Sequence, residues 1–217
     1  MEENDYNDTH IETVKSYSDW KSFHTELVVI ALILISTLVV VSLFVYKGSP
    51  LPVKQEQEVH YSSEQWDNFN ILYDAAVTGG YDDEEAKVAL IMTSLAESNA
   101  KNLANDGTSD ILKEDQKPEE IKRSMLMPNV QGVGNDAGSM GILQQQYPWW
   151  GSVEELMNPY IAAIFFLEKY DEQKGHNIPA KIQSVQKSAI SDGSQYAQFE
   201  QEARKIVVTI YAQRDSN

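Results

Sequence analysis

The chain of 217 residues contains no cysteine. This absence excludes disulfide frameworks, cysteine-based zinc sites and thiol nucleophiles. Histidine is scarce too, and the histidines that occur show no spacing typical of metal ligands. They are His10, His24, His60 and His176. The sequence therefore predicts no metal site.

Basic residues are also few. The chain has 17 lysine and arginine residues against 33 aspartate and glutamate residues, a formal net charge of −16. Nucleic-acid-binding proteins normally present a basic face, so we predict no nucleic-acid partner. The acidic excess lies on both sides of one apolar segment: residues 1–26 carry 2 basic and 7 acidic side chains, and residues 48–217 carry 14 and 26.

That apolar segment, residues 27–46, contains no charged side chain. Twenty helical residues would span about 30 Å, which matches the hydrocarbon core of a bilayer. A buried core helix is one alternative, but the segment shows no amphipathic pattern. A cleaved signal peptide is another, but it would have a basic leader and small residues before the cleavage site. We therefore predict an uncleaved signal anchor that crosses the lipid bilayer once.

Composition divides the rest of the chain into three parts. Residues 1–26 are polar and acidic and are predicted to be a tail with little fixed structure. Residues 47–62 contain Gly48, Pro50 and Pro52 and are predicted to be a stalk. Residues 63–214 alternate helical apolar patterns with turn signals and show almost no strand pattern. We therefore predict a mainly α globule of five or six helices with its own core.

Capping residues predict where these helices begin. Ser63 and Asp82 each precede a helical apolar pattern, and Asn158 followed by Pro159 is typical of a helix start. Three further helices are predicted over residues 118–126, 178–187 and 195–212.

Glu97 is the leading candidate for a catalytic acid. It follows an apolar helical pattern that runs from Val88 to Leu95, and a long polar stretch comes after it. The helix dipole at a C-terminus and nearby apolar groups both disfavour an ionised carboxylate, so both raise its pKa. A raised pKa suits general acid catalysis near neutral pH. The alternative is an ordinary solvated glutamate in the last turn of a helix.

A second informative stretch, residues 136–151, begins about forty residues after Glu97. It combines small residues, three consecutive glutamines and two tryptophans. Small residues let backbone approach a ligand closely, amides form paired hydrogen bonds, and aromatic rings stack on sugar faces. That mixture is typical of a carbohydrate groove. Alternatively, the glycines form turns, and Trp149 and Trp150 anchor a core.

Together these stretches resemble the lysozyme-like superfamily of lytic transglycosylases and goose-type lysozymes, and most nearly the actinobacterial lysozyme-like domain of cell-wall hydrolases. In that domain, a helix ending in glutamate-serine precedes a serine-leucine-glycine-leucine-phenylalanine-glutamine-glutamine loop. A tryptophan-glycine, a methionine-aspartate-proline helix start and an alanine-valine-glutamine-arginine-serine segment follow. This chain has the corresponding segments in the same order over about residues 64–210. They are Glu97-Ser98, Ser139 to Gln145, Trp150-Gly151, Met157 to Pro159 and Ser184 to Ser188.

The resemblance implies a mainly α, lysozyme-like fold of the transglycosylase type, and it gives roles by matched position. Glu97 corresponds to the catalytic acid/base, and Gln186 lies in the segment that closes the groove. For Trp149, Trp150 and Tyr160, stacking on sugar and packing in a core both stay open. The predicted substrate-binding residues are Ser139, Met140, Gly141, Gln144, Gln145, Trp150, Tyr160 and Gln186. No cofactor is expected, because protonation of a glycosidic oxygen needs only a carboxylic acid.

The chain departs from the family pattern in two places. The family's acidic residue shortly before serine-leucine-glycine is absent, and the nearest carboxylate, Asp136, is the candidate for a second acid. The stretch 105–133 is longer than in the family and is predicted to be an insertion. Ile121, Met125 and Leu126 in it predict a small helix packed over the groove, which would restrict access.

The resulting prediction is a peptidoglycan lytic transglycosylase or muramidase that cleaves the MurNAc-β-1,4-GlcNAc bond. Its partner would be the glycan strand, and it would serve local wall remodelling or open the wall for a secretion or conjugation complex. Lysines flank both ends of the anchor, so charge gives no orientation. The activity itself requires a cytoplasmic N-terminus and an extracytoplasmic C-terminal domain at the cell membrane.

Two other interpretations stay open. A catalytically weak lysozyme-fold module for glycan binding or assembly would fit the acidic composition, because the wall is anionic and repels an acidic protein. A membrane-tethered helical scaffold would leave the ordered motifs unexplained. Within the enzyme interpretation, the missing second carboxylate favours transglycosylase products that end in 1,6-anhydro-muramic acid.

Overall fold

The computed structural model describes residues 59–173, 177–188 and 190–216. These residues contain eight α-helices and are 56% helical, which confirms the predicted mainly α class. Residues 59–217 form a compact unit. None of the helices in the described ranges is long and apolar enough to cross a membrane. The predicted tail and anchor, and the stalk up to residue 58, lie outside the described residues.

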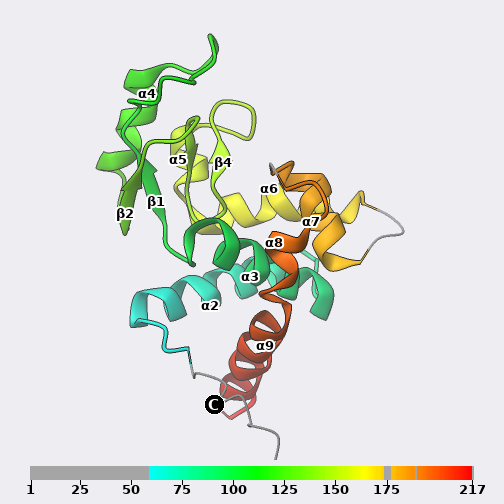
Figure 1. Cartoon of the computed structure of the whole chain (residues 1–217). Coiled ribbons are helices and arrows are strands. Elements are labelled where there is room, and N and C mark those ends of the chain that lie inside the picture. Colours follow the sequence, from blue (N-terminus) through cyan, green and yellow to red (C-terminus); the bar gives the residue numbers. More distant parts are fainter. Residues whose placement is uncertain (1–58, 174–176, 189, 217) are drawn as a thin grey trace, which may run out of the picture. The chain divides into compact units, whose positions relative to one another are not determined.

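Helix α3 (Glu84–Ser98) is the centre of the main core. Eleven of its 15 residues are buried, and such a helix has to be surrounded by other elements. It packs against α6 (Pro159–Asp171), α7 (Ile178–Gln186) and α9 (Glu200–Asp215). It also contacts α2 (Ser63–Thr78) and the short α8 (Ser194–Ala197). Figure 1 shows α3 in the middle of these helices.

The chain between α3 and α6 forms a second region with short strands. Strand β1 (Leu103–Asn105) pairs in parallel with β2 (Gly132–Gly134), and β3 (Ser139–Met140) pairs antiparallel with β4 (Gln145–Gln146). The sequence pattern did not predict these strands, because two or three residues are too few to show alternation. Three short helical elements complete the region (Figure 1). They are α4 (Pro118–Lys122), the 3-10 helix η1 (Arg123–Leu126) and α5 (Val153–Leu156).

Two helix starts differ by one residue from the prediction. Helix α2 is capped by Ser62, whose hydroxyl accepts from the N–H of Gln65 while the Gln65 side chain accepts from the N–H of Ser62. Helix α3 is capped by Asp83, whose carboxylate accepts from the N–H of Ala86, whereas Asp82 pairs with Lys87. In both cases, the residue that reaches the free N–H groups lies one position from the predicted cap.

The other helices lie close to their predicted ranges. Asn158 caps α6 and Pro159 is its first residue, as predicted. The pattern over 195–212 is divided into α8 and α9, with Phe199 packed against the main core where the two meet.

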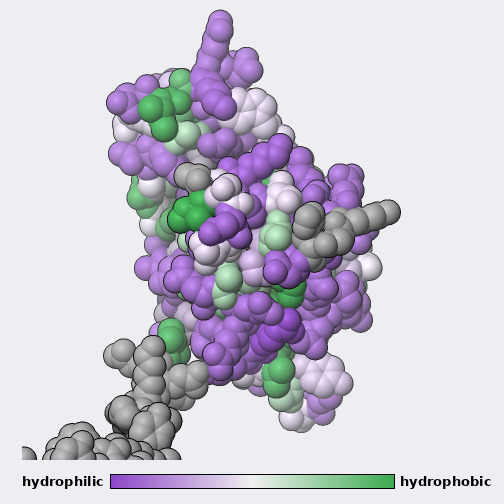
Figure 2. Space-filling model, turned by 45° about the vertical axis from the view of Figure 1, so that its right-hand side comes forward, coloured by the Kyte–Doolittle hydropathy of each residue, from purple (hydrophilic) through white to green (hydrophobic). Residues whose placement is uncertain are grey.

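The predicted insertion 105–133 packs on a second, small core that it shares with Met140 and α5. Ile121 is fully buried, whereas Met125 and Leu126 are exposed, Leu126 by 81%. Arg123 holds the helical turn to its surroundings through ion pairs with Glu120 and Glu154. On the face drawn in Figure 2, hydrophobic residues form small separate patches in a hydrophilic surface.

Candidate active site

A groove of about 820 Å³ contains the predicted catalytic residue. Glu97 lines it from the end of α3, and Lys113 lines it from the loop before α4. Further wall comes from the strand β3–β4 turn, from Trp149 and Trp150, from the C-terminal end of α6 and from residues 184–188. Residues 118–126 do not line the groove, so the expected covering of the groove by this helix is wrong; of the loop before it, Lys113 lines the groove.

The end of α3 is fastened beside the β3–β4 turn. Ser98 donates its hydroxyl to the carbonyl of Ile142 at 2.7 Å and is also within hydrogen-bond distance of the Ser94 carbonyl. Asn99 ends the helix with a left-handed backbone, φ 53°. These contacts fix the position of the preceding residue, Glu97, relative to the loop that follows β3.

The Glu97 carboxyl has one hydrogen-bond partner among the described side chains, the hydroxyl of Tyr196. Tyr196 is fully buried, and its Oη lies 2.6 Å from Glu97 Oε1. Burial, together with the negative charge of Glu97, raises the pKa of Tyr196 above its usual value. The phenol therefore stays protonated at neutral pH and donates to the carboxyl.

The pKa of Glu97 is raised. Burial of the carboxyl is the largest cause, the nearby Asp136 charge adds to it, and the hydrogen bond from Tyr196 partly offsets it. The position at a helix C-terminus acts in the same direction as burial, because the negative end of the helix dipole disfavours a carboxylate. Such a carboxyl retains its proton to higher pH than a solvated glutamate and can protonate a bound substrate.

Asp136, the candidate second acid, lies near Glu97 but is not among the described residues that line the groove. Partial burial raises the pKa of its carboxyl, and hydrogen bonds from Ser139 lower it. The Asn105 amide also donates to it, with 3.2 Å between Nδ2 and Oδ1. The carboxylate is thus engaged in fastening its own loop.

The turn between β3 and β4 contains two residues with a left-handed backbone, Gly141 and Gln144. Gly141 has φ 78°, and a Cβ there would lie 2.1 Å from the carbonyl oxygen of Leu156. No other residue fits at such a close approach. Gln144 also has a positive φ, and its amide donates to the Gly141 carbonyl at 2.8 Å. The turn therefore presents Gln144 at the groove while Gly141 fits it against α5.

The structure brings together Glu97, Ser139, Gln144, Trp150 and Gln186 from the predicted set. These side chains come from α3, the β3–β4 region, the segment after it and α7, so only the tertiary structure joins them. The Gln186 amide is also bonded to the Leu143 carbonyl at 2.8 Å, which fastens α7 to the β3–β4 turn.

Four predicted substrate-binding residues do not line the groove. One is Gly141, buried in the turn against α5, and the other three are Met140, Gln145 and Tyr160. Met140 is fully buried in the second core, and the Gln145 amide donates to the carbonyl of Ala162 in the interior. Gln145 and Gln146 are successive residues of β4 and face opposite sides, so Gln146 lines the groove while Gln145 points inward. Gln144 lines the groove from the turn before this strand. Tyr160 contacts the Thr78 hydroxyl and lines a different cavity of about 560 Å³.

Sequence reasoning missed Tyr196 and the lysines of the groove. Lys113 Nζ lies 4.6 Å from the ring centroid of Trp149, and Lys169 Nζ lies 4.4 Å from that of Trp150. Tyr196 and Glu97 are 99 residues apart, so no local pattern could have indicated the pair. For the two lysines, the only indication in the sequence was the pair of adjacent tryptophans over which they lie.

In the described ranges, no group of three or more histidine, aspartate or glutamate side chains could hold a metal ion. Comparison with models of known protein families and with curated proteins found no match. The function therefore has to be argued from the groove and its residues.

Proposed function

We propose that the chain is a membrane-anchored peptidoglycan lytic transglycosylase with a lysozyme-like fold. It cleaves the MurNAc-β-1,4-GlcNAc bond, with Glu97 as its acid/base. The observation that carries the proposal is a half-buried carboxyl with a raised pKa, held by Tyr196 at the wall of a groove rich in amides and tryptophans. The ordered motifs from Glu97-Ser98 to Ser184–Ser188 support the same assignment.

The reaction needs two proton transfers, and Glu97 performs both. Protonated Glu97 donates its proton to the glycosidic oxygen as the bond from that oxygen to the muramyl C1 breaks. The substrate's N-acetyl oxygen stabilises C1. The Glu97 carboxylate then takes the proton of the muramyl 6-hydroxyl while O6 bonds to C1, which gives the 1,6-anhydro product. Tyr196 donates to Oε1, which leaves Oε2 for the transferred proton.

The position of Asp136 favours this reaction over hydrolysis. An inverting hydrolase needs a second carboxylate that activates a water in the groove, and a retaining one needs a nucleophile close to the sugar. Asp136 is held by Asn105 and Ser139 and is not part of the described groove lining. The ring closure by the 6-hydroxyl requires no such partner.

The proposed setting follows from the substrate. The anchor at residues 27–46 would keep the enzyme at the cell membrane, with the N-terminus in the cytoplasm and residues 63–214 facing the wall. Cleavage there would serve local remodelling, or would open the wall for a secretion or conjugation complex.

A digest of purified peptidoglycan by the full-length chain, analysed by mass spectrometry, tests the proposal. Products ending in 1,6-anhydro-muramic acid are expected, and products one water heavier would instead indicate a muramidase and make Asp136 the next residue to replace. Glu97→Gln should lower the rate about 10²- to 10⁴-fold, because it removes the acidic proton. Glu172→Gln is the matched control, since Glu172 lines the same groove.

The fold of the Glu97→Gln protein can be verified independently. Because folding raises the pKa of Glu97, the folded protein holds this proton longer than the unfolded chain, and stability falls as pH rises through that range. Above it, Glu97→Gln should be at least as stable as the wild type in thermal unfolding. A well-folded Glu97→Gln protein that still digests peptidoglycan at the wild-type rate would refute the catalytic role and favour a glycan-binding module.

A further inference from the structure

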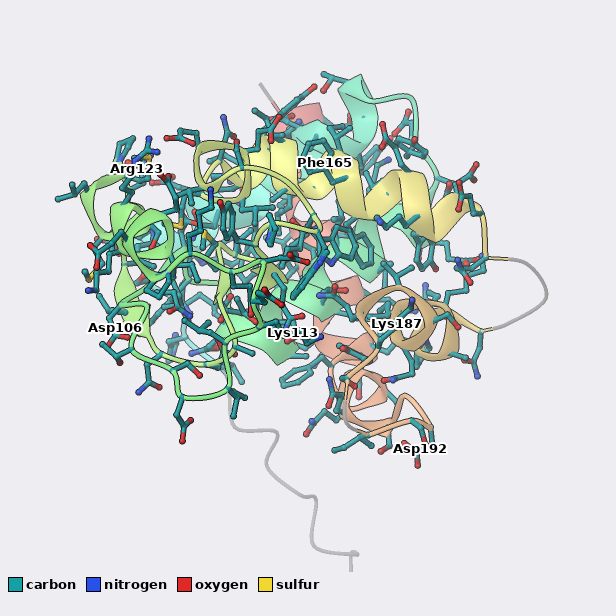
Figure 3. All side chains as sticks on the ribbon, turned by 90° about the horizontal axis from the view of Figure 1, so that it is seen from above. Asp106, Lys113, Arg123, Phe165, Lys187 and Asp192 are labelled. Carbon is teal, nitrogen blue, oxygen red and sulfur yellow. The ribbon has the colours of Figure 1, made fainter. Side chains whose placement is uncertain are left out.

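The groove holds three lysines that the proposed reaction does not use. They are Lys113, Lys169 and Lys187, and all three are exposed. Figure 3 labels Lys113 on the loop before α4 and Lys187 at the end of α7, so the positive charges come from separate elements. Residues 48–217 as a whole are acidic, with 14 basic and 26 acidic side chains. A local gathering of positive charge in such a chain is suited to binding a negatively charged group.

No such partner is present within the described protein. None of the three lysines forms an ion pair with a described carboxylate, whereas other cations of the described ranges do. Examples are Lys87, Lys122, Arg123, Lys181, Arg204 and Arg214. The described groove lining contains two carboxyl groups, those of Glu97 and Glu172. Glu97 holds its proton to higher pH than a solvated glutamate does. When Glu97 is protonated, the groove lining therefore carries a net positive charge.

Two of the lysines are placed on the tryptophans. The ammonium of Lys113 lies over Trp149, which is 44% exposed, and that of Lys169 lies over Trp150. Each ammonium is attracted by the electron-rich ring face beneath it. One face of each indole is thus already covered by a cation. A neutral sugar that stacked on that face would have to displace the exposed ammonium into water, and the cation–π attraction would be lost without an ion pair in return.

A sugar that bears a carboxylate faces no such penalty. Its ring can stack on the indole while its carboxylate receives the displaced ammonium in an ion pair. We propose that the Lys113–Trp149 and Lys169–Trp150 pairs select carboxylated glycan strands over neutral ones with the same backbone. The inference rests on the proposed function and specifies its substrate: the carboxylate is that of the muramyl lactyl group or of the peptide attached to it.

Binding, measured apart from cleavage, tests the selection. The full-length Glu97→Gln protein is titrated calorimetrically with three hexasaccharides: neutral chitohexaose, peptide-free peptidoglycan glycan with free lactyl carboxylates, and the same glycan with its peptides. Both carboxylated probes should bind more tightly than chitohexaose, and the difference should shrink as salt is raised to about 0.5 M. The peptide-free and peptide-bearing probes distinguish the lactyl from the peptide carboxylate as the source.

A double substitution, Lys113→Met with Lys169→Met, keeps an unbranched side chain near each ring and removes the charge. It should weaken binding of the preferred carboxylated probe about tenfold, while chitohexaose binds at least as tightly as before because the rings are uncovered. The double Lys→Arg variant keeps charge and stacking and should retain the preference. Lys101→Met with Lys117→Met, two exposed lysines outside the groove lining, is the matched control and should change neither affinity.

The outcomes separate the two proposals. Equal affinity for neutral and carboxylated probes, or parallel changes in both on the Met substitution, would overturn the selection and leave the glycosidase proposal intact. Tighter binding of poly(glycerol phosphate) than of any glycan would overturn it as well. Failure to bind any of the three hexasaccharides would instead refute the proposed function itself.

Discussion

The two walls of the groove are held by different forces. Glu97 belongs to a helix that is buried on nearly all sides in an apolar core of helices. The wall that contains β3 and β4 is held by buried amides that donate to backbone carbonyls, in addition to the small apolar core around Met140. Asn105 donates to the carbonyl of Ser139 at 3.0 Å, and Gln116 donates to those of Ala137 and Tyr147 at 2.6 and 2.8 Å.

Apolar packing positions the acid, and hydrogen-bonded amides shape the polar side of the groove. Apolar packing tolerates little displacement, so it holds the acid at a fixed depth. Short loops offer few apolar residues, and their backbone carbonyls need donors when they are buried. Buried asparagine and glutamine satisfy those carbonyls and so shape a polar wall. The position of Glu97 therefore depends on hydrophobic burial, whereas that of the groove-facing loop depends on hydrogen bonding.

The largest expected effect comes from the apolar side of the comparison. Phe166 is fully buried in the main core on α6. Phe166→Ala should cost about 3–5 kcal/mol of unfolding free energy, because it leaves a cavity in the packed interior. Denaturant unfolding of the full-length chain measures this. A cost close to that of a surface substitution would contradict the assigned core.

A smaller loss is expected on the hydrogen-bonded side. Asn105→Ala removes the amide that binds the Ser139 carbonyl and the Asp136 carboxylate, at a cost of about 1–3 kcal/mol. Digestion of peptidoglycan should fall as well, since the side of the groove that contains β3 loses a supporting hydrogen bond. Asn135→Ala, which removes an exposed amide beside Asp136, is the control. Equal effects of the two substitutions would break the proposed distinction between the walls.

Tyr196→Phe tests the one polar contact that the described main core makes with the acid. It should cost about 0.5–1.5 kcal/mol, the net value of one hydrogen bond. Since this bond lowers the pKa of Glu97, its loss should raise that pKa further and move the alkaline limb of the pH–activity profile to higher pH. Tyr170→Phe is the matched control, because Tyr170 makes a similar bond to Glu85 that lies outside the groove lining. A profile that moves in both variants, or in neither, would argue against the assignment.

The smallest effect is expected at the tip of the insertion. Leu126 is 81% exposed, so Leu126→Ser should change stability by no more than about 0.5 kcal/mol. Digestion of peptidoglycan should be unchanged, because this residue does not line the groove. A marked loss of activity with normal stability would show that the tip takes part in binding the wall.

Local chemistry made much of the helical framework predictable. The start of α6 follows from Asn158 and Pro159, and the buried face of α3 follows from apolar residues at helical spacing. The one-residue errors at Ser62 and Asp83 arose because neighbouring serines or aspartates can all cap a helix, and only backbone geometry decides which side chain reaches the free N–H groups. The short strands escaped prediction because their pairing, not their sequence, creates them.

The sequence by itself determined the mainly α class, the ends of most helices to within a residue or two, and the choice of Glu97 as the candidate acid, because these depend on residues within a few turns of one another. Only the tertiary structure decided the rest of the site. It placed Tyr196 against Glu97 across 99 residues, set Lys113 and Lys169 over the tryptophans, and turned Met140 and Gln145 into the interior. Such contacts leave no local trace, because burial and charge are set by whichever segments the fold brings together.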